Sequence, residues 1–294
     1  MKKLPLILTI LGVVITSREA LAVVRVASSI PDLASIASYI GGDRVSAFSV
    51  TRGQDNAHNV EVLPSYMIKV AKADVYLKVG LALDQWAPLI IDGSRNRKLK
   101  VVDCSMGVNI LELPTGRVSA EQGDVHPNGN PHYWIDPENA AIVAMTIADA
   151  LGGVDPEGAK IYHANATRFA DECAKRTVEW RRRLAPATTH PVVTYHRSWI
   201  YFTNAFGFKN AGYVEPIPGI PPTATHLKHI VDVIKGQGVK LVIQESFYPG
   251  DAGEFIARQT GAKVITLDVA CDGTGSNDYF DHLEEVVEAV EAVR

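Results

Sequence analysis

The chain has 294 residues, a formal net charge of −4 and a hydrophobic content of 47%. The small net charge comes without a large basic block, which argues against nucleic acid as a partner. The length exceeds one ordinary core and suits two domains of roughly 100 to 150 residues each. Cys104, Cys173 and Cys271 lie far apart in sequence, so at most one disulfide can form and a thiolate zinc knuckle is not expected.

The N-terminal segment has the pattern of an export signal. Two lysines precede an apolar run over residues 4–15, and residues 20–22 read Ala-Leu-Ala, the small-x-small pattern of a cleavage site. The run is too short to span a bilayer, which takes roughly 20 residues. We therefore predict a signal peptide over residues 1–22 and a mature chain from Val23 in the bacterial periplasm, with no lipid anchor.

From residue 23 to residue 153, short apolar segments alternate with amphipathic ones. The apolar segments predict strands over residues 24–28, 45–50, 74–79 and 99–103. The amphipathic segments predict helices that begin at Pro31, at Pro64 with Ser65 as its cap, and at Pro137, the last ending at Gly152-Gly153. Residues 114–131 are rich in Gly, Pro, Asn and Asp, which predicts a mobile surface loop.

The longest helical pattern runs from Asp155 to Ala185 and contains few helix breakers. Close to 30 helical residues would be roughly 45 Å long, enough to run along two lobes. A single stiff helix between lobes would limit hinge motion more than flexible linking strands do.

After Pro186 the alternation of strands and helices starts again. The predicted strands cover residues 192–195, 212–214, 240–244 and 263–267, and the predicted helices cover residues 199–206, 223–235, 250–260 and 277–293. This order favours parallel sheets flanked by helices. We therefore predict an α/β protein with an N-terminal lobe over residues 23–153, a linking helix over 154–186 and a similar C-terminal lobe over 187–294.

Four polar residues have positions typical of a metal site between such lobes. His132 lies on a short loop between Pro131 and an Asp-Pro helix start, and the other three come at or just after predicted strand ends. Ligands of parallel sheets gather beyond the carboxyl ends of the strands. Imidazole nitrogens with one carboxylate oxygen suit zinc and other borderline divalent ions. We predict that His58, His132, His196 and Asp268 close around one metal ion.

Other residues are weaker candidates. His226 and His229 share one face of a predicted helix, but without a third donor we interpret them as solvated. His126, in the predicted loop, either captures ions weakly or is an ordinary loop residue. Glu245 follows a predicted strand and is an alternative carboxylate ligand or a partner of a ligand, ranked behind Asp268.

The sequence contains none of the common enzyme motifs. His-Glu-x-x-His, Gly-x-Ser-x-Gly and the P-loop pattern are all missing. Four protein ligands with no open position for water describe a carrier site and not a catalytic one, so we expect no enzyme. Two alternatives stay open: a periplasmic zinc-dependent hydrolase with Asp268 or Glu245 as its base, and an adhesin whose metal is structural.

Four segments resemble the solute-binding proteins of bacterial ABC importers for zinc and manganese. They are Gly53 to Ser65 with His58, Asn130-Pro131-His132-Tyr133-Trp134-Ile135-Asp136-Pro137, Tyr195 to Phe202 with His196, and Leu267-Asp268 before Tyr279-Phe280. The first segment departs from the family pattern at Asn56-Ala57 and at Val60. The resemblance covers nearly the whole mature chain.

The resemblance implies that His58 and His132 come from the first lobe and His196 and Asp268 from the second. Relatives that take manganese generally have Glu where this chain has His196, so the implied cargo is Zn²⁺, with Mn²⁺ or iron as the alternative. The implied partners are a permease in the inner membrane and its cytoplasmic ATPase, and we expect a monomer. Because binding needs neutral imidazoles, affinity is expected to fall as the pH drops through roughly 6.5.

Overall fold

A computed structural model describes residues 23–114, 116 and 126–293 of the chain. The predicted signal peptide, residues 1–22, and most of the predicted loop between Pro114 and His126 lie outside the described residues. Across the described ranges, the structure contains no helix with the length and apolar content needed to span a lipid bilayer.

The first lobe is built on a four-stranded parallel sheet with the order β2-β1-β3-β4. Its strands are β1 (Val24–Ser28), β2 (Val45–Ser49), β3 (Val75–Lys78) and β4 (Lys100–Asp103). All four coincide with predicted strands, because each is a short apolar run bounded by polar or turn-forming residues.

The helices of this lobe are α1 (Pro31–Gly41), α2 (Pro64–Val70), α3 (Ala87–Ser94) and α4 (Pro137–Val154). Three of them begin at the predicted prolines. The predicted cap of α2 is wrong: Leu63 is the N-cap, no side chain caps the helix, and Ser65 already lies inside it. The predicted end of α4 is also too early, because the helix continues through Gly152 and Gly153.

The second lobe repeats the parallel arrangement, with the strand order β6-β5-β7-β8. The strands are β5 (Val192–Thr194), β6 (Asn210–Tyr213), β7 (Leu241–Glu245) and β8 (Lys263–Leu267), and the helices are α6 (Ile200–Phe206), α7 (Ala224–Gln237) and α8 (Asp251–Thr260). The order in each sheet places the second strand at one edge beside the first. The predicted fold of two similar α/β lobes is confirmed.

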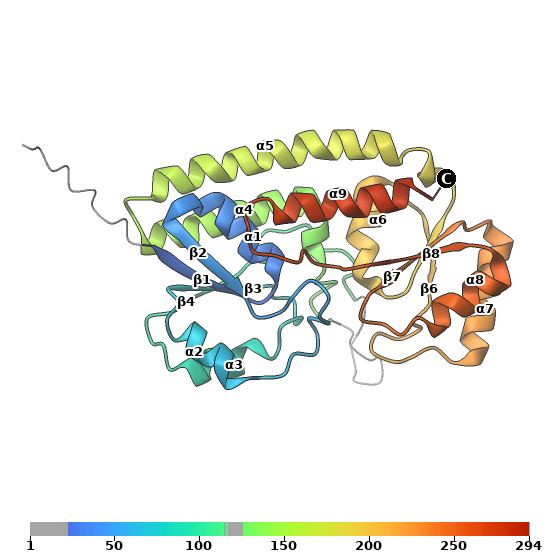
Figure 1. Cartoon of the computed structure of the whole chain (residues 1–294), viewed down its shortest axis with the longest axis horizontal. Helices are drawn as coiled ribbons and strands as arrows, with labels where there is room; N and C mark the ends of the chain where they lie inside the picture. Colours follow the sequence, from blue (N-terminus) through green and yellow to red (C-terminus); the bar gives the residue numbers. More distant parts are fainter. Residues whose placement is uncertain (1–22, 115, 117–125, 294) are drawn as a thin grey trace, which may run out of the picture.

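A long helix, α5 (Ala159–Leu184), runs along both lobes (Figure 1). Its 26 residues correspond to about 39 Å. It packs against α1 and α4 of the first lobe, against α6 of the second, and against the last helix, α9 (Asp278–Glu291). Because α9 also contacts α1, the C-terminal segment returns to the first lobe.

One hydrophobic cluster extends through both lobes on the side of α5. It contains Val26 and Leu77 of the first sheet, Phe169 of α5, and Val192 and Ile243 of the second sheet. Separate clusters lie under α2 and α3 in the first lobe and under α7 and α8 in the second. The two lobes therefore share a core and are not joined by a linker alone.

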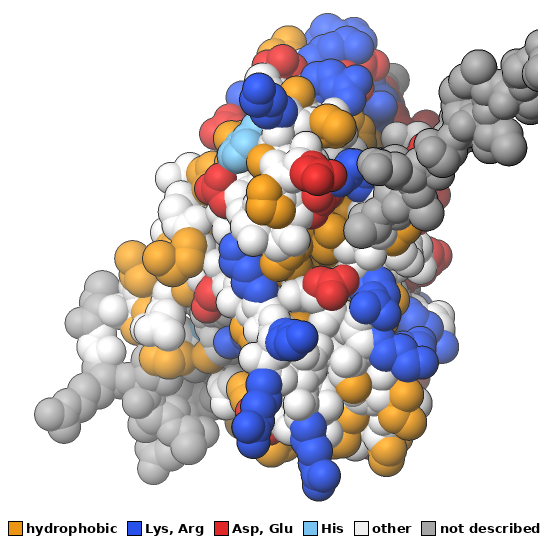
Figure 2. Space-filling view, turned by 90° about the vertical axis from the view of Figure 1, so that its left-hand side faces the viewer, with side chains coloured by type: hydrophobic (Ala, Val, Ile, Leu, Met, Phe, Trp, Pro, Cys, Tyr) orange, Lys and Arg blue, Asp and Glu red, His pale blue; other side chains and the backbone are white. Residues whose placement is uncertain are grey.

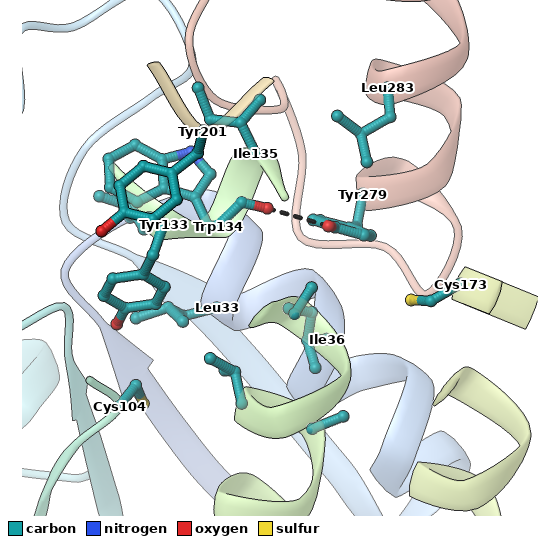
Figure 3. Packing of buried hydrophobic residues seen from close by; sticks show 14 of the residues in the cluster. Leu33, Ile36, Cys104, Tyr133, Trp134, Ile135, Cys173, Tyr201, Tyr279 and Leu283 are labelled. Carbon is teal, nitrogen blue, oxygen red and sulfur yellow. Dashed lines mark hydrogen bonds between the residues drawn. The ribbon is translucent and has the colours of Figure 1, made fainter. Parts of the chain in front are cut away.

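Aromatic side chains lie where the lobes meet (Figure 3). Tyr279 donates a hydrogen bond from its hydroxyl to the carbonyl of Trp134 at 2.9 Å, and the indole of Trp134 donates to the carbonyl of Val269 at 2.9 Å. Both contacts join the segment after His132 to the segment around β8 and α9. They hold the His132 loop against the second half of the chain.

The three cysteines are free and buried. The sequence allowed one disulfide, and Cys104, Cys173 and Cys271 form none. Burial raises the pKa of the Cys104 thiol well above its usual range, so this thiol stays protonated and is a poor metal ligand.

The end of the first lobe mixes charges of both signs. Figure 2 shows many Lys and Arg side chains on this face, with acidic and hydrophobic side chains between them. This mixture fits the small net charge of the chain.

Candidate metal centre

Three histidines from distant parts of the chain converge between the lobes. One ring nitrogen from each of His58, His132 and His196 lies within 4.8 Å of the other two. The Nε2 atoms of His58 and His132 are 3.1 Å apart. Two nitrogens bound to one tetrahedral zinc ion are about 3.3 Å apart, given zinc–nitrogen bonds of about 2.0–2.1 Å. The three rings therefore need only small shifts to share an ion.

His58 lies on the loop between β2 and α2. Its backbone N–H donates to the side-chain oxygen of Asn56 at 3.0 Å, which forms a tight local turn. The indole of Trp86, next to α3, donates to the carbonyl of Ala57 at 2.8 Å and holds the loop in place. The chain departs from the family pattern at these positions, yet His58 points into the site.

His132 is oriented by a residue two positions before it. The side-chain oxygen of Asn130 accepts hydrogen bonds from the backbone N–H of His132 at 3.0 Å and from its Nδ1 at 2.9 Å. Because Nδ1 carries the proton, the lone pair of Nε2 is available to a metal ion. Asp136 then caps α4 by accepting from the backbone N–H of Glu138 at 2.9 Å, which fixes the end of the loop.

Asn130 also joins the two lobes. Its amide nitrogen donates to the carbonyl of Arg197, the residue after His196, and to a carboxylate oxygen of Glu112, each at 3.0 Å. Arg197 in turn forms an ion pair with Glu112 at 2.6 Å and lies over the ring of Tyr213. One carboxamide thus contacts a ligand from the first lobe and the backbone next to a ligand from the second.

His196 lies two residues after the end of β5 and directly precedes a short 3-10 turn over Arg197–Trp199. Its Nδ1 donates to a carboxylate oxygen of Glu215 at 2.5 Å, and both side chains are buried. The contact leaves Nε2 of His196 to face the other two histidines. The sequence analysis missed Glu215. The available signal was its place just beyond β6, which pairs with β5.

The environment keeps the first two histidines neutral. Burial, together with the neighbouring imidazoles, lowers the pKa of His58 and of His132 well below 6.5. A neutral imidazole is the form that binds a metal ion. The site is therefore ready to accept a cation at neutral pH.

His126 lies closer to the centre than the sequence indicated. Its ring stacks on that of His58 with centroids 5.1 Å apart, and burial lowers its pKa to about 4. Within the described residues, its Nε2 is buried and has no hydrogen-bond partner. His126 therefore lines the site, although its nitrogens lie outside the close group of three.

Asp268 lies apart from the three histidines. It follows β8, and one of its oxygens accepts a hydrogen bond from the hydroxyl of Ser246. It lines a cavity of about 730 Å³ together with Asp272, Asp281 and Glu285. The described residues thus bring three of the four predicted ligands within reach of one another, and Asp268 stays a prediction.

Glu245 is fully buried at the end of β7. Neither of its carboxylate oxygens has a hydrogen-bond partner among the residues that the structure describes. Burial raises its pKa, while nearby His196 and Ser198 oppose the rise. The raised pKa favours the protonated form of Glu245, and a cation bound beside His196 would favour its ionised form.

The structure is that of a two-lobed metal-binding protein. Each lobe has a parallel sheet, α5 runs along both, and three imidazoles converge between them. The family model described as zinc-uptake complex component A, periplasmic, matches residues 26–293. The chain belongs to this family of metal-binding components of uptake transporters, which is not a family of enzymes.

Individual relatives are named for different metals. The iron-binding protein YfeA of Yersinia pestis is 27% identical over 245 residues, which cover 81% of this chain and 75% of the relative. The manganese-binding lipoprotein MntA of Halalkalibacterium halodurans is 25% identical over 271 residues, covering 90% and 86%. A crystal structure of ZnuA superposes with a TM-score of 0.80 at 25% identity, covering 92% and 98% of the two chains. The fold is thus shared by proteins named for different metals.

Proposed function

We propose that this protein captures Zn²⁺ with high affinity in the periplasm and delivers it to an ABC permease in the inner membrane, which a cytoplasmic ATPase drives. The convergence of three imidazoles between the lobes is the observation that carries the proposal. Membership of the zinc-uptake family supports it.

The donor chemistry favours zinc over manganese. Imidazole nitrogens suit zinc, whereas manganese prefers carboxylate, carbonyl and water oxygens. The relatives named for iron and manganese support a second candidate cargo. Glu245 and Asp268, at the ends of the neighbouring strands β7 and β8, are the carboxylates that such a cargo would use.

Asp268 is proposed as the fourth ligand. Its strand pairs with β7, so Asp268 lies next to Ser246 and close to the buried Glu245. To reach the ion, the Asp268 side chain has to exchange the Ser246 hydroxyl for the metal. Four protein ligands would close the coordination shell, as in a carrier, whereas a hydrolase keeps one position for water.

The test is metal analysis of protein purified without added ions, followed by competition titrations with Zn²⁺ and Mn²⁺. We expect bound zinc and tighter binding of zinc than of manganese. His132→Ala is expected to lose at least 100-fold in zinc affinity, because it removes one of three converging nitrogens. Tighter binding of manganese than of zinc would replace the zinc proposal with the second candidate.

Asp268→Ala is compared with Glu285→Gln, a change at an exposed carboxylate of the same cavity. A loss confined to Asp268→Ala supports the fourth-ligand role. Equal affinities for both variants and the unsubstituted protein would remove Asp268 from the site.

A further inference from the structure

The three histidines have different hydrogen-bond partners. His132 donates to the neutral side chain of Asn130, whereas His196 donates from Nδ1 to the carboxylate of Glu215 at 2.5 Å. His196 and Glu215 are each only 4% exposed. A carboxylate behind a metal-binding imidazole fixes its tautomer and ring orientation and strengthens its donor nitrogen. Among the described contacts, His196 is the member of the group with such a partner.

The Glu215 carboxylate is itself held by other segments of the second lobe. Its second oxygen accepts from the backbone N–H of Gly219 at 3.0 Å, and the hydroxyl of Tyr248 lies 3.3 Å from both oxygens. Gly219 has a φ of +79°, a left-handed conformation that favours glycine, and it lies in a turn closed by the pair Ile217 and Ile220. The same carboxylate therefore contacts the ligand and this surface turn.

The side chain of Glu215 is not needed to form the sheet. Backbone bonds fix this edge independently: the N–H of Glu215 donates to the carbonyl of Tyr195, and that of Val214 donates to Thr194, each at 2.9 Å. With His196 neutral, the contact with Glu215 is a hydrogen bond to a charged acceptor and not an ion pair. The side chain is thus placed to act on His196.

On the basis of the proposed zinc function, we infer that Glu215 is the positioning residue of His196. It keeps the proton on Nδ1, directs Nε2 toward His58 and His132, and makes the orientation of this ligand depend on the turn over residues 215–220. Removal of such a partner typically costs 10- to 100-fold in metal affinity.

The experiment compares Glu215→Gln and Glu215→Ala with Tyr248→Phe. Glutamine keeps one oxygen that can accept from His196, but its amide group then faces the N–H of Gly219, another donor. Tyr248→Phe removes one donor to the carboxylate and leaves the contact with His196. We expect zinc affinity to fall about 10- to 100-fold in Glu215→Ala, less in Glu215→Gln, and least in Tyr248→Phe.

Two further measurements separate positioning from general damage. Long-range ¹H–¹⁵N NMR spectra of the metal-free protein, with the His196 signals assigned by their loss in His196→Gln, report the tautomer of this ring. We expect the Nδ1–H form in the unsubstituted protein and a mixture of tautomers in Glu215→Ala. Amide exchange at Gly219 is expected to slow when Zn²⁺ binds, and to lose this response in both Glu215 variants.

The inference is overturned if the folded Glu215 variants bind zinc within twofold of the unsubstituted protein and keep its His196 tautomer. If Glu215→Ala does not fold, Glu215→Gln decides on the same criteria. Failure of the unsubstituted protein to bind zinc is a different result, which refutes the proposed function itself.

Discussion

At the scale of single residues, the buried imidazoles determine how proton and metal compete. The pKa values of His58 and His132 are lowered well below 6.5, so these rings stay neutral when the pH drops through that value. The sequence alone placed the loss of zinc affinity near pH 6.5. We now expect affinity to hold to lower pH and to fall when these two rings protonate. Competition titrations from pH 8 to pH 4.5 measure this, and a steep fall already complete at pH 6 would contradict it.

Asp32, at the start of α1, makes the stability of the fold depend on pH. Burial raises its pKa from 3.8 to about 7, and one oxygen accepts from the backbone N–H of Cys271 at 3.3 Å. The folded state therefore binds more protons than the unfolded state between these values, and this contribution to stability is lost as the pH rises. Asp32→Asn removes the dependence. We expect its stability relative to the unsubstituted protein to increase by up to about 3 kcal/mol from pH 5 to pH 8.

Urea denaturation of Asp32→Asn and of the unsubstituted protein, both metal-free, at several pH values measures this difference in stability. A stability difference that stays constant across the range would show that Asp32 is ionised at all of these pH values.

The sequence pointed to His58 and His196 because they follow strands of parallel sheets, where ligands gather, and to His132 because it lies on a short loop before a helix. The structure brings one ring nitrogen of each within 4.8 Å of the others. The sequence could not identify Glu215 or Asn130 as their partners. The contact of Glu215 with His196 depends on strand order, and the order β6-β5-β7-β8 is not encoded in any local pattern. The contact of Asn130 with His132 is local, two residues apart, but the asparagine by itself does not signal a partner of a ligand. His126 was underrated because its stacking on His58 is a tertiary contact.

At the scale of elements, the loop that carries His58 packs closely on the segment between β8 and α9. A Cβ atom added at Gly53 would lie 2.6 Å from the carbonyl oxygen of Ala270 and 2.8 Å from that of Cys271. Backbone oxygens cannot move aside as flexible side chains do. Gly53→Ala is therefore expected to lower the free energy of unfolding by about 1–3 kcal/mol and to weaken zinc binding by displacing His58.

The matched control is Gly236→Ala, inside α7, where an added Cβ meets nothing within 4 Å. This change is expected to leave zinc binding unchanged and to stabilise the helix by up to about 1 kcal/mol. Thermal melting and zinc titration of both variants provide the comparison. Equal behaviour of the two would mean that the close contact at Gly53 relaxes without cost.

The sequence predicted the positions of most helices and strands. It missed α3 for a local reason and the packing of α9 for a tertiary one. The long pattern after Asp155 predicted α5, since a helix of many turns leaves a repeated apolar stripe. The short α3 was missed because it contains Pro88 and Gly93, residues that usually mark turns. The return of α9 to α1 and α5 follows from tertiary packing, which no single segment reveals.

At the scale of the whole molecule, the shared core indicates that the fold does not depend on the metal. The cluster that joins the two lobes contains buried side chains from both sheets and from α5. We expect removal of zinc with a chelator to leave the far-ultraviolet circular dichroism unchanged. Adding zinc back at 1,000 times its dissociation constant should stabilise the protein by about 4 kcal/mol. Loss of secondary structure on chelation would instead favour the reading of the metal as structural.

The packing of α5 against both lobes has a consequence for how fast a bound ion can leave. A wide opening of the two lobes would expose aromatic and aliphatic side chains of the shared cluster to water. This exposure costs roughly 25 cal/mol for each Å² of apolar surface. Spontaneous escape of the ion by that route is therefore slow. If the protein delivers zinc to a permease as proposed, we expect release to depend on a smaller movement of the loop that carries His58, made when the permease docks.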